Sequence, residues 1–239
     1  MISFVVPTLN EEQTVAKTLE CLASYSGDHE IIVSDDNSTD GTVEVCRRYA
    51  HTVVRYDEPE KRTIAQVRNQ GAAAARGDFL VFVDADVLIP DIDEFFRNSY
   101  ARFRSDSRLV ALTGESRVVP ESATAADRFV FTMLGLQFLL QNNILRVGAA
   151  SGKFQMVAAD AFETVGGFNE ELVASEDMDL FRRLSRVGRT YFARDLTVYH
   201  SGRRAKAIGW RKLLWQWFTN SVSVFFFNRS VSSEWKVIR

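Results

Sequence analysis

One stretch decides the fold: residues 76–86 read RGDFLVFVDAD. Five apolar residues, Phe79–Val83, follow a glycine turn and end at two acids, Asp84 and Asp86. A short apolar run that sits between turn signals and alternates with helical patterns is typical of a strand in an α/β sheet. We therefore expect a strand over Phe79–Val83 that carries the two acids at its carboxyl end.

The same alternation of apolar runs and helical patterns continues toward the N-terminus. Further strands are expected at Ile2–Val6, Glu30–Val33 and Thr52–Arg55, and helices at Glu11–Ser24, Thr42–Ala50 and Thr63–Arg76, the last capped by Gly77. This spacing predicts a mainly parallel sheet with helices on both faces. In such sheets ligands bind beyond the carboxyl ends of the strands, where the acidic loops gather.

The second half of the chain is less regular. We expect strands at Leu109–Val119, Ser151–Val157, Thr190–Ala193 and Thr197–His200, and helices at Phe129–Leu145 and Glu176–Val187. With 239 residues and 46% hydrophobic composition, the chain is long enough for one substantial core. We divide it into a single α/β domain over residues 1–200 and a basic, aromatic, helical tail over residues 201–239.

Asp84 and Asp86 are candidates for a metal site. The period-two geometry of extended chain points both carboxylates to one side, where their charges repel unless a cation neutralises them. Mg²⁺ and Mn²⁺ prefer oxygen ligands and keep open positions for substrate phosphates. The alternative is a solvated loop that happens to contain two acids.

Two other segments offer polar groups for a nucleotide. Residues 35–42, DDNSTDGT, follow a strand, and we assign Asp36 to the nucleotide, while Ser38 or Asp40 caps the next helix. Arg68 lies on the helix before the Asp84 strand, from which its guanidinium reaches a diphosphate. A solvated arginine is the alternative reading.

The helix expected at Glu176–Val187 begins with acids. Asp177 shares the inward face with Leu180 and Leu184 by helical spacing, and inward-facing acids ordinarily have a partner or a task. We therefore consider Asp177 a candidate general base. The alternative is that these acids complement the helix dipole behind an N-cap at Ser175. Asp179 is expected to point elsewhere and to pair with Arg182 or Arg183. His200 alone suggests a structural histidine.

Taken together, these motifs resemble the family 2 glycosyltransferases over residues 1–200. The motifs that carry the resemblance occur in the expected order at residues 7–12 (PTLNEE), 35–42, 68–71 (RNQG), 76–86, 166–170 (GGFNE) and 175–180 (SEDMDL). The resemblance implies the GT-A fold, a single mixed α/β domain with a Rossmann-like nucleotide-binding half and an acceptor half. It also implies a metal-dependent enzyme that takes a sugar from a nucleotide-diphosphate donor. A UDP-sugar is the first expected donor and a GDP-sugar the second.

The resemblance assigns roles to residues at matching positions. Asp36 binds the base, Asp84 and Asp86 hold Mn²⁺ or Mg²⁺ and the diphosphate, Asp177 is the base of inverting members, and His200 completes the metal site. The remaining positions expected against the nucleotide are Pro7, Thr8, Asn10, Glu11, Arg68 and Ala85. Val87 replaces a third acid found in many members, which leaves the metal site intact. A Q-x-x-R-W pattern is missing near Trp210–Trp217, so single rather than processive transfer is expected.

Rival functions have weaker support. A sugar-nucleotide pyrophosphorylase shares the general fold, but its Gly-rich N-terminal loop is missing from Pro7–Glu12. A non-catalytic nucleotide-sugar-binding protein remains an alternative. The sequence contains neither the dinucleotide fingerprint nor the P-loop, and a nucleic-acid role has only the basic tail in its favour.

The tail differs from the body in charge. Residues 196–233 carry six Lys or Arg and no acid, so the remainder of this chain of net charge −2 is −8. The uncharged stretches 129–145 and 213–228 are too short to span a bilayer, but the second follows a basic cluster and has an apolar stripe. We expect it either to lie on an anionic membrane surface, with a lipid, lipid-linked or glycan acceptor, or to pack in the core or a dimer.

The start of the chain and the cysteines bear on location. Met1 leads directly into a strand-like run, so no signal peptide is expected. Cys21 and Cys46 are expected to be buried, reduced thiols. These features predict a cytoplasmic protein, peripheral at the inner face of the membrane if the tail lies there.

Overall fold

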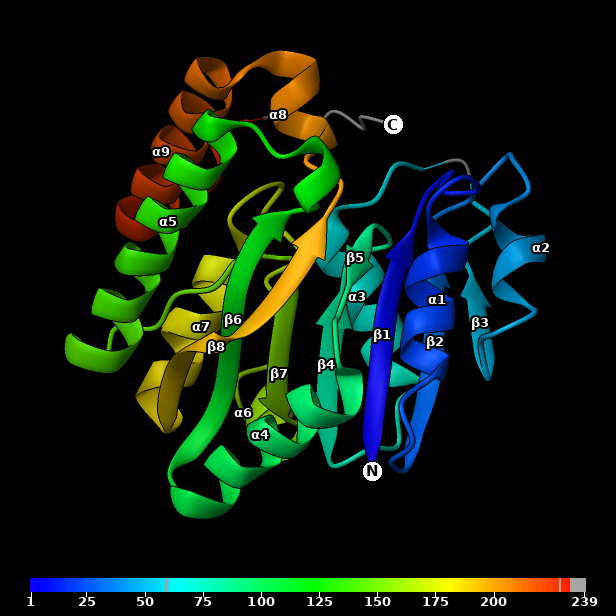
Figure 1. The fold of residues 1–239 in the computed structure, drawn as a ribbon, viewed down its shortest axis with the longest axis horizontal. Helices are drawn as coiled ribbons and strands as arrows, with labels where there is room; N and C mark the ends of the chain where they lie inside the picture. Colours follow the sequence, from blue (N-terminus) through cyan, green and yellow to red (C-terminus); the bar gives the residue numbers. More distant parts are fainter. Residues whose placement is uncertain (59, 228, 233–239) are drawn as a thin grey trace.

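The computed structural model describes residues 1–58, 60–227 and 229–232, and its centre is an eight-stranded sheet of order β3-β2-β1-β4-β7-β6-β8-β5 (Figure 1). Its strands are β1 (Ile2–Thr8), β2 (His29–Asp35), β3 (Thr52–Arg55), β4 (Phe79–Val83), β5 (Val87–Leu88), β6 (Leu109–Val118), β7 (Phe154–Ala158) and β8 (Arg189–His200). All four strands predicted in the first half are present, with Thr52–Arg55 and Phe79–Val83 at the predicted bounds.

The sheet is parallel in its N-terminal half and mixed beyond it. Strands β3, β2, β1 and β4 pair in parallel, β7 is antiparallel to both β4 and β6, β6 is parallel to β8, and β8 is antiparallel to β5. The parallel strands are joined by helices, as parallel pairing requires. The mixed α/β fold expected from the sequence is therefore confirmed, with parallel pairings in a small majority.

Helices cover both faces of the sheet. The α-helices are α1 (Val15–Ala23), α2 (Thr42–Cys46), α3 (Ile64–Ala73), α4 (Ile92–Ser105), α5 (Ala125–Leu139), α6 (Ala159–Thr164), α7 (Glu176–Val187), α8 (Arg203–Ile208) and α9 (Trp210–Phe227), with a 3-10 turn η1 (Pro120–Ser122) and a π-helix η2 (Leu140–Ile144). Successive residues of β1 point to opposite cores. Phe4 packs with Leu19 of α1 and Phe96 of α4, whereas Val5 packs with Ala65 of α3 and Leu180 of α7.

Several boundaries differ from the predicted ones. The α3 helix starts with a capping box between Thr63 and Gln66 but ends at Ala73, three residues before the predicted end. Gly77 is therefore not its cap. It lies against β1 instead, where its N–H donates to Ser3 Oγ at 2.8 Å and an added Cβ would sit 2.7 Å from the Ser3 backbone nitrogen.

Two further differences concern whole elements. The α4 helix was not predicted, although its buried residues Ile92, Phe95, Phe96 and Ser99 have helical spacing. The two short final strands are one strand, β8, whose register against β6 shifts between Ala193 and Thr197. A bulge of this kind separates the apolar runs in sequence without ending the strand.

Most of the described tail residues are helical and form α8 and α9. No helix in the described ranges is long and apolar enough to cross a membrane. The domain boundary at residue 200 stays a prediction, and residues 233–239 of the predicted tail lie outside the described residues. Both cysteines are free thiols, Cys46 buried and Cys21 half-buried, and burial raises the pKa of Cys46 to about 12.

Candidate active site

The carboxyl ends of β1 and β2 are tied together by Asp35. Thr8 lies opposite Asp35 in the parallel register, and its hydroxyl donates to Asp35 Oδ1 at 2.9 Å. The Ser38 N–H donates to Asp35 Oδ2 at 2.9 Å, and the Asp35 side chain is fully buried. Asp35 and Thr8 therefore fix the shape of this edge rather than present free groups to a ligand.

Asp36 has a different environment. Its Oδ1 accepts from Arg62 Nε at 2.7 Å, and the Arg62 guanidinium stacks on the Tyr56 ring at 3.9 Å from the centroid. An acceptor, a cation and an aromatic ring thus lie together just beyond β2. This chemistry suits the polar edge of a nucleobase, the role predicted for Asp36.

The loop after β1 is clamped to the loop after β2. Asn10 adopts a left-handed conformation with φ of 52°, and its Oδ1 accepts from the Thr39 N–H at 2.6 Å. The Glu11 N–H donates to Thr42 Oγ1 at 2.7 Å. Pro7 is buried in β1. The structure thus brings the four predicted residues of this loop to the edge of the sheet.

The Lys153 ammonium lies between Asp84 and Asp86. Its Nζ donates to Asp84 Oδ2 at 3.0 Å and to Asp86 Oδ1 at 3.1 Å. Burial opposes ionisation of both acids, but Lys153 outweighs it, aided by Arg68 at Asp84 and Ser201 at Asp86, and holds both pKa values below their ordinary range. The pair is therefore ionised and already binds a cation.

The donor set partly fits a divalent metal. The two ionised carboxylates supply the oxygen ligands that Mg²⁺ and Mn²⁺ prefer. His200 does not fit in its present tautomer: Nδ1 accepts from the Gly202 N–H at 3.1 Å, so the buried Nε2, which has no hydrogen-bond partner, carries the proton. Burial lowers the pKa of His200 to about 3, so the ring is neutral. Within the described ranges, no three His, Cys, Asp or Glu residues are placed to share an ion.

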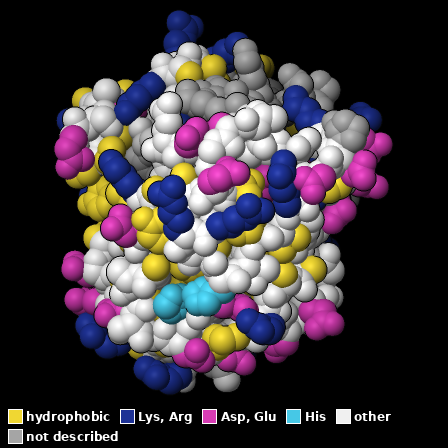
Figure 2. Space-filling model, turned by 90° about the vertical axis from the view of Figure 1, so that its right-hand side faces the viewer, with side chains coloured by type: hydrophobic (Ala, Val, Ile, Leu, Met, Phe, Trp, Pro, Cys, Tyr) yellow, Lys and Arg dark blue, Asp and Glu magenta, His cyan; other side chains and the backbone are white. Residues whose placement is uncertain are grey.

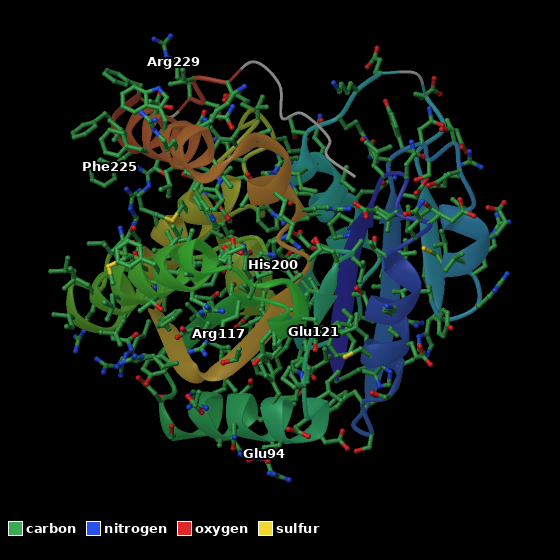
Figure 3. The ribbon with its side chains drawn as sticks, turned by 45° about the horizontal axis from the view of Figure 1, so that its top comes forward. Glu94, Arg117, Glu121, His200, Phe225 and Arg229 are labelled. Atoms are coloured by element: carbon green, nitrogen blue, oxygen red, sulfur yellow. The ribbon has the colours of Figure 1, made fainter. Side chains whose placement is uncertain are left out.

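His200 lies in the middle of the molecule, where β8 ends and the tail begins (Figure 3). Its ring packs edge-on against Phe131 at 4.9 Å between centroids. Ala85, which lies between Asp84 and Asp86 in the chain and was also predicted at the nucleotide, is buried in the core. Its carbonyl accepts from Thr18 Oγ1 at 3.0 Å.

Arg68 connects the two acidic motifs. The buried guanidinium donates from Nη2 to Asp84 Oδ1 at 2.9 Å and from Nη1 to Glu176 Oε1 at 2.7 Å. Gly152 permits this close approach, since an added Cβ would lie 2.6 Å from Arg68 Nη2. Arg68 is thus neither solvated nor free. It positions both acids from α3.

Asp177 and Glu176 begin α7 and differ in their partners. Glu176 is buried and holds Arg68, whereas Asp177 is half-buried and accepts from the Met178 N–H at 2.8 Å. No described side chain hydrogen-bonds to Asp177. Burial raises the pKa of both carboxyls, the Asp177 charge raises that of Glu176 further, and Arg68 opposes both shifts. Asp177 therefore combines a raised pKa with an oxygen that no described side chain occupies, as a proton acceptor requires.

The environment of this pair departs from the predictions at two positions. Ser175 takes the N-cap position but in a left-handed conformation with φ of 65° and without a side-chain cap bond. Such a backbone costs about 1 kcal/mol in a non-glycine residue and is typical of functional sites. Asp179 was expected to point away from the core, but it is buried, because Arg182 and Arg183 both pair with it as predicted.

The tail contributes two residues that the sequence did not reveal. Ser201 Oγ donates to Asp86 Oδ2 at 2.5 Å, and Arg203 Nη1 donates to Glu11 Oε2 at 2.6 Å. Lys153 and Arg62 were also missed. None of these residues belongs to a local motif. For Lys153 the only signal is the antiparallel register of β4 and β7, where Val83 pairs with Phe154 and places residue 153 beside residue 84.

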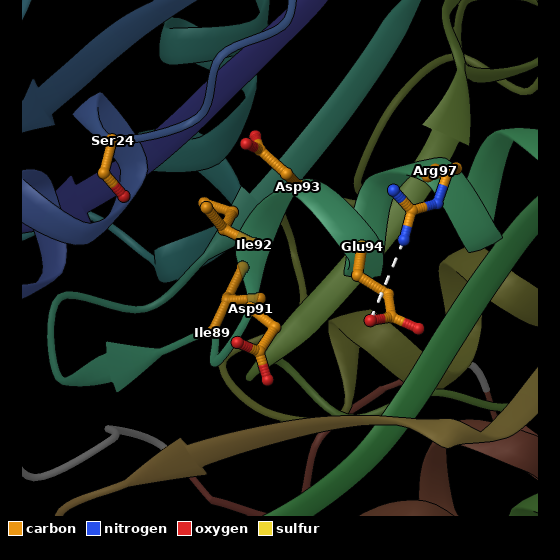
Figure 4. Close-up of a pocket in the computed structure, with 7 residues that line it drawn as sticks. All are labelled: Ser24, Ile89, Asp91, Ile92, Asp93, Glu94 and Arg97. Atoms are coloured by element: carbon orange, nitrogen blue, oxygen red, sulfur yellow. Dashed lines mark ion pairs between the residues drawn. The ribbon is translucent and has the colours of Figure 1, made fainter.

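Two surface hollows lie away from this edge. One lies at the start of α4, where Glu94 and Arg97 form an ion pair at 3.8 Å (Figure 4). The other is lined by Asp179, Arg182, Arg183 and neighbours on α7 and the Gly166 turn. Neither is lined by a predicted catalytic, nucleotide or metal residue, so the chemistry is concentrated at the edge of the sheet.

The chain matches known proteins over most of its length. The sequence pattern of Glycosyl transferase family 2 matches residues 3–125. The succinoglycan biosynthesis protein ExoA of Rhizobium meliloti is 29% identical over 236 residues, which cover 90% of this chain and 66% of that protein. The β-monoglucosyldiacylglycerol synthase of Synechocystis is 29% identical over 194 residues, covering 77% and 40%.

Solved structures share the fold. The mannosyltransferase PcManGT from Pyrobaculum calidifontis, solved with GDP-Man and Mn²⁺, superposes with a TM-score of 0.72 at 20% identity, covering 91% of this chain and 61% of its own. The chain spans between 40% and 67% of the length of the curated relatives it matches first. The predicted GT-A fold is thereby confirmed.

Proposed function

Because this chain belongs to glycosyl transferase family 2 and is a glycosyltransferase, we propose that it moves a sugar from a nucleotide-diphosphate donor to an acceptor hydroxyl. The donor lies across the edge formed by the loops after β1, β2 and β4. The base lies toward Asp36 and the diphosphate toward Asp84 and Asp86. The acceptor approaches from the side of α7.

One observation carries this proposal: a continuous ionic network joins the two acidic motifs. Lys153 contacts Asp84 and Asp86, and Arg68 joins Asp84 to Glu176 beside Asp177. A cation-binding carboxylate pair and a basic carboxylate are thereby held at fixed separation. Sugar transfer needs both, because charge develops on the leaving diphosphate while the acceptor hydroxyl loses a proton.

Asp84 and Asp86 are the residues that would hold Mn²⁺ or Mg²⁺. A divalent ion at this pair supplies positive charge to the leaving diphosphate. Lys153 provides the same sign of charge from the protein itself. His200 packs against Phe131, and a direct bond from its Nε2 to a metal would require the other tautomer.

Asp177 is the proposed general base. Its raised pKa strengthens its affinity for the acceptor proton, and its half-buried position leaves it open to the acceptor. Attack by the activated hydroxyl on the face opposite the leaving diphosphate inverts the anomeric configuration. Glu176 is assigned to positioning Arg68 rather than to proton transfer, because it is buried and ion-paired with that guanidinium, whereas Asp177 is half-buried and has no such pair.

The donor and acceptor are proposed by class. A UDP-sugar is the first choice and a GDP-sugar the second. PcManGT, one solved structure with the same fold, carries GDP-Man and Mn²⁺. The acceptor is a glycan, a lipid or a lipid-linked glycan, and a relative is named for synthesis of a glycolipid. Single transfer and a cytoplasmic location remain predictions from the sequence.

The test is release of nucleoside diphosphate from UDP-, GDP- and dTDP-sugars, with Mn²⁺ or Mg²⁺ and again with EDTA. Donor-specific release that EDTA abolishes supports the donor and the metal together. If EDTA leaves the release unchanged, the proposed metal dependence is wrong, but the proposed sugar transfer still stands. If no donor is cleaved and none binds in a calorimetric titration, the proposed donor class is wrong.

A further inference from the structure

Exposed large hydrophobic side chains are concentrated in two segments. Of the sixteen in the described residues, fifteen lie in residues 129–147 or 214–231, and only Val187 lies elsewhere. Scattered exposed apolar side chains are ordinary, but a concentration of this kind marks a surface that meets an apolar partner. We call the surface formed by α5, η2 and α9 the apolar face.

The α5 helix and the π-helix η2 present a stripe of apolar side chains to solvent. Its members Phe129, Met133, Leu136 and Leu140 follow at intervals of four, three and four residues, which is the repeat of one helix face. The opposite side of α5 is buried through Val130, Gly135 and Phe138. A surface helix ordinarily presents polar groups on its outer side, and here both sides are apolar.

The α9 helix repeats this arrangement. Trp215, Phe218, Val222 and Phe225 follow at intervals of three, four and three residues, and Phe218 and Phe225 are 61% and 60% exposed. Figure 3 shows Phe225 on the outer side of α9, away from the sheet. The buried side of the helix contributes Leu213, Asn220 and Val224. This helix therefore also presents apolar groups outward.

The two stripes belong to one surface. Both helices lie on the left-hand side of Figure 1 and run in the same general direction. Trp210 joins their N-terminal ends: its Nε1 donates to Asp127 Oδ1 at 2.9 Å, and its ring packs edge-on against Phe131 at 5.5 Å. The stripes are thus held together by a half-buried anchor, Trp210, and not by the exposed side chains themselves.

The charge around the apolar face has one sign. Residues 125–147 and 203–232 contain eight Lys or Arg and a single acid, Asp127, which is buried. Arg128, Arg146, Arg211, Lys212 and Arg229 are exposed. By contrast, Figure 2 shows acidic and basic side chains intermixed on the side of β3. The exposed charges of the segments that form the apolar face are thus all basic, and they complement an anionic partner.

We propose that the apolar face docks on the surface of a bilayer containing anionic phospholipid, with α5 and α9 in the interfacial plane. Phe and Trp side chains suit the boundary between headgroups and acyl chains, and the basic border suits lipid phosphates. The sequence pattern had suggested α9 alone, and the structure adds α5 and η2.

This docking has a consequence for the site. The tail that leads into the apolar face begins with Ser201 and Arg203, which contact Asp86 and Glu11. A protein docked through α5 and α9 therefore holds the edge of its sheet close to the lipid surface. The inference does not depend on the donor or on turnover.

The test is co-sedimentation of the full chain with sucrose-loaded vesicles, without donor or metal, using phosphatidylcholine alone and phosphatidylcholine with 30% phosphatidylglycerol. Three variants lower the net charge by two each, so they are matched: Leu136→Glu with Phe218→Glu, Arg211→Gln with Lys212→Gln, and Arg97→Glu on α4. The substituted side chains are exposed, and near-ultraviolet circular dichroism checks that each variant is folded.

The wild type and Arg97→Glu should sediment with anionic vesicles and much less with neutral ones. Leu136→Glu with Phe218→Glu should lose at least tenfold in partitioning, and Arg211→Gln with Lys212→Gln about tenfold or more, since each interfacial cation contributes roughly 1 kcal/mol. Equal sedimentation of all four proteins overturns the proposal. The proposal is also overturned if the wild type sediments with neither kind of vesicle. If such a wild type forms a dimer that Leu136→Glu with Phe218→Glu dissociates, a second copy of the chain covers the apolar face instead.

Discussion

Replacing Lys153 by Met should make the free protein bind Mn²⁺ more tightly. A divalent ion shared by Asp84 and Asp86 must displace the ammonium, whose Nζ lies 3.0 and 3.1 Å from their oxygens. Each contact is worth about 5 kcal/mol at an effective dielectric constant near 20, and desolvation offsets most of it. A net competition of about 1.4 to 2.8 kcal/mol corresponds to a ten- to hundredfold gain in Mn²⁺ affinity.

The assay is calorimetric titration of Mn²⁺ into the protein without nucleotide, confirmed by the electron paramagnetic resonance signal of free Mn²⁺. In EDTA, Lys153→Met should also melt several degrees below the wild type, because two close carboxylates lose their counter-charge, and Mn²⁺ should restore the melting temperature. Lys17→Met, on the exposed side of α1, removes one positive charge away from the site and serves as the control.

The Lys153 reasoning is refuted if Lys153→Met and the wild type bind Mn²⁺ within threefold of each other. Weaker binding by Lys153→Met would refute it as well, since the ammonium would then assist the metal. Lys153→Arg keeps the charge and should bind Mn²⁺ no more tightly than the wild type. If none of these proteins binds Mn²⁺ at millimolar concentration, the proposed metal site is wrong.

Three further outcomes are expected. Asp177→Asn should lower turnover about a thousandfold and leave the donor dissociation constant, measured by calorimetry, within threefold, as removal of a general base requires; loss of donor binding instead would contradict the role. Arg68→Met should strand Glu176 and Asp84 without their cation and cost about 3 kcal/mol, a fall in melting temperature of roughly 10 °C, whereas an unchanged melting curve would show that the network is not structural. Hydrogen bonds from Ser3 and Arg76 outweigh burial and lower the pKa of Glu30 below its ordinary 4.5, so this carboxylate stabilises the protein above that pH and the contribution is lost as the pH falls below it. Glu30→Gln should therefore be less stable than the wild type at pH 7 by about 1 to 2 kcal/mol in urea unfolding, with the difference shrinking below pH 4.5; a constant difference would contradict this linkage.

The sequence predicted the first half of the fold well because its signals are local. Each parallel strand there is a continuous apolar run followed by a helix with its own pattern, as at Phe79–Val83. The α4 helix was overlooked although Ile92, Phe95 and Phe96 have helical spacing, since the charged residues between them mask the stripe. Two strands were predicted in place of β8, because a bulge interrupts the apolar pattern of a sequence in the same way as a turn.

The candidate site was predictable where one motif supplies it and not where distant strands combine. Each acidic motif is local in sequence and stood out: Asp84 and Asp86 are separated by one residue, and Glu176 and Asp177 are adjacent. Of the cations that hold them, Arg68 was singled out by its own motif, but Lys153 was not. Lys153 reaches Asp84 through antiparallel pairing across 69 residues, and Arg203 reaches Glu11 across 192. Helical spacing predicted that Asp177 faces inward and Asp179 outward, whereas Asp179 is the more buried of the two. Spacing alone does not take account of Arg182 and Arg183, which both pair with Asp179.

The Glu11–Arg203 contact bears on the order in which the protein assembles. Pairing among β1, β2 and β4 closes only modest loops and can begin while synthesis continues. The loop that carries Glu11 gains its last partner after 192 more residues have been made. We expect the sheet edge to become competent for ligand at the end of folding, so a nascent chain that already has a stable core is still inactive.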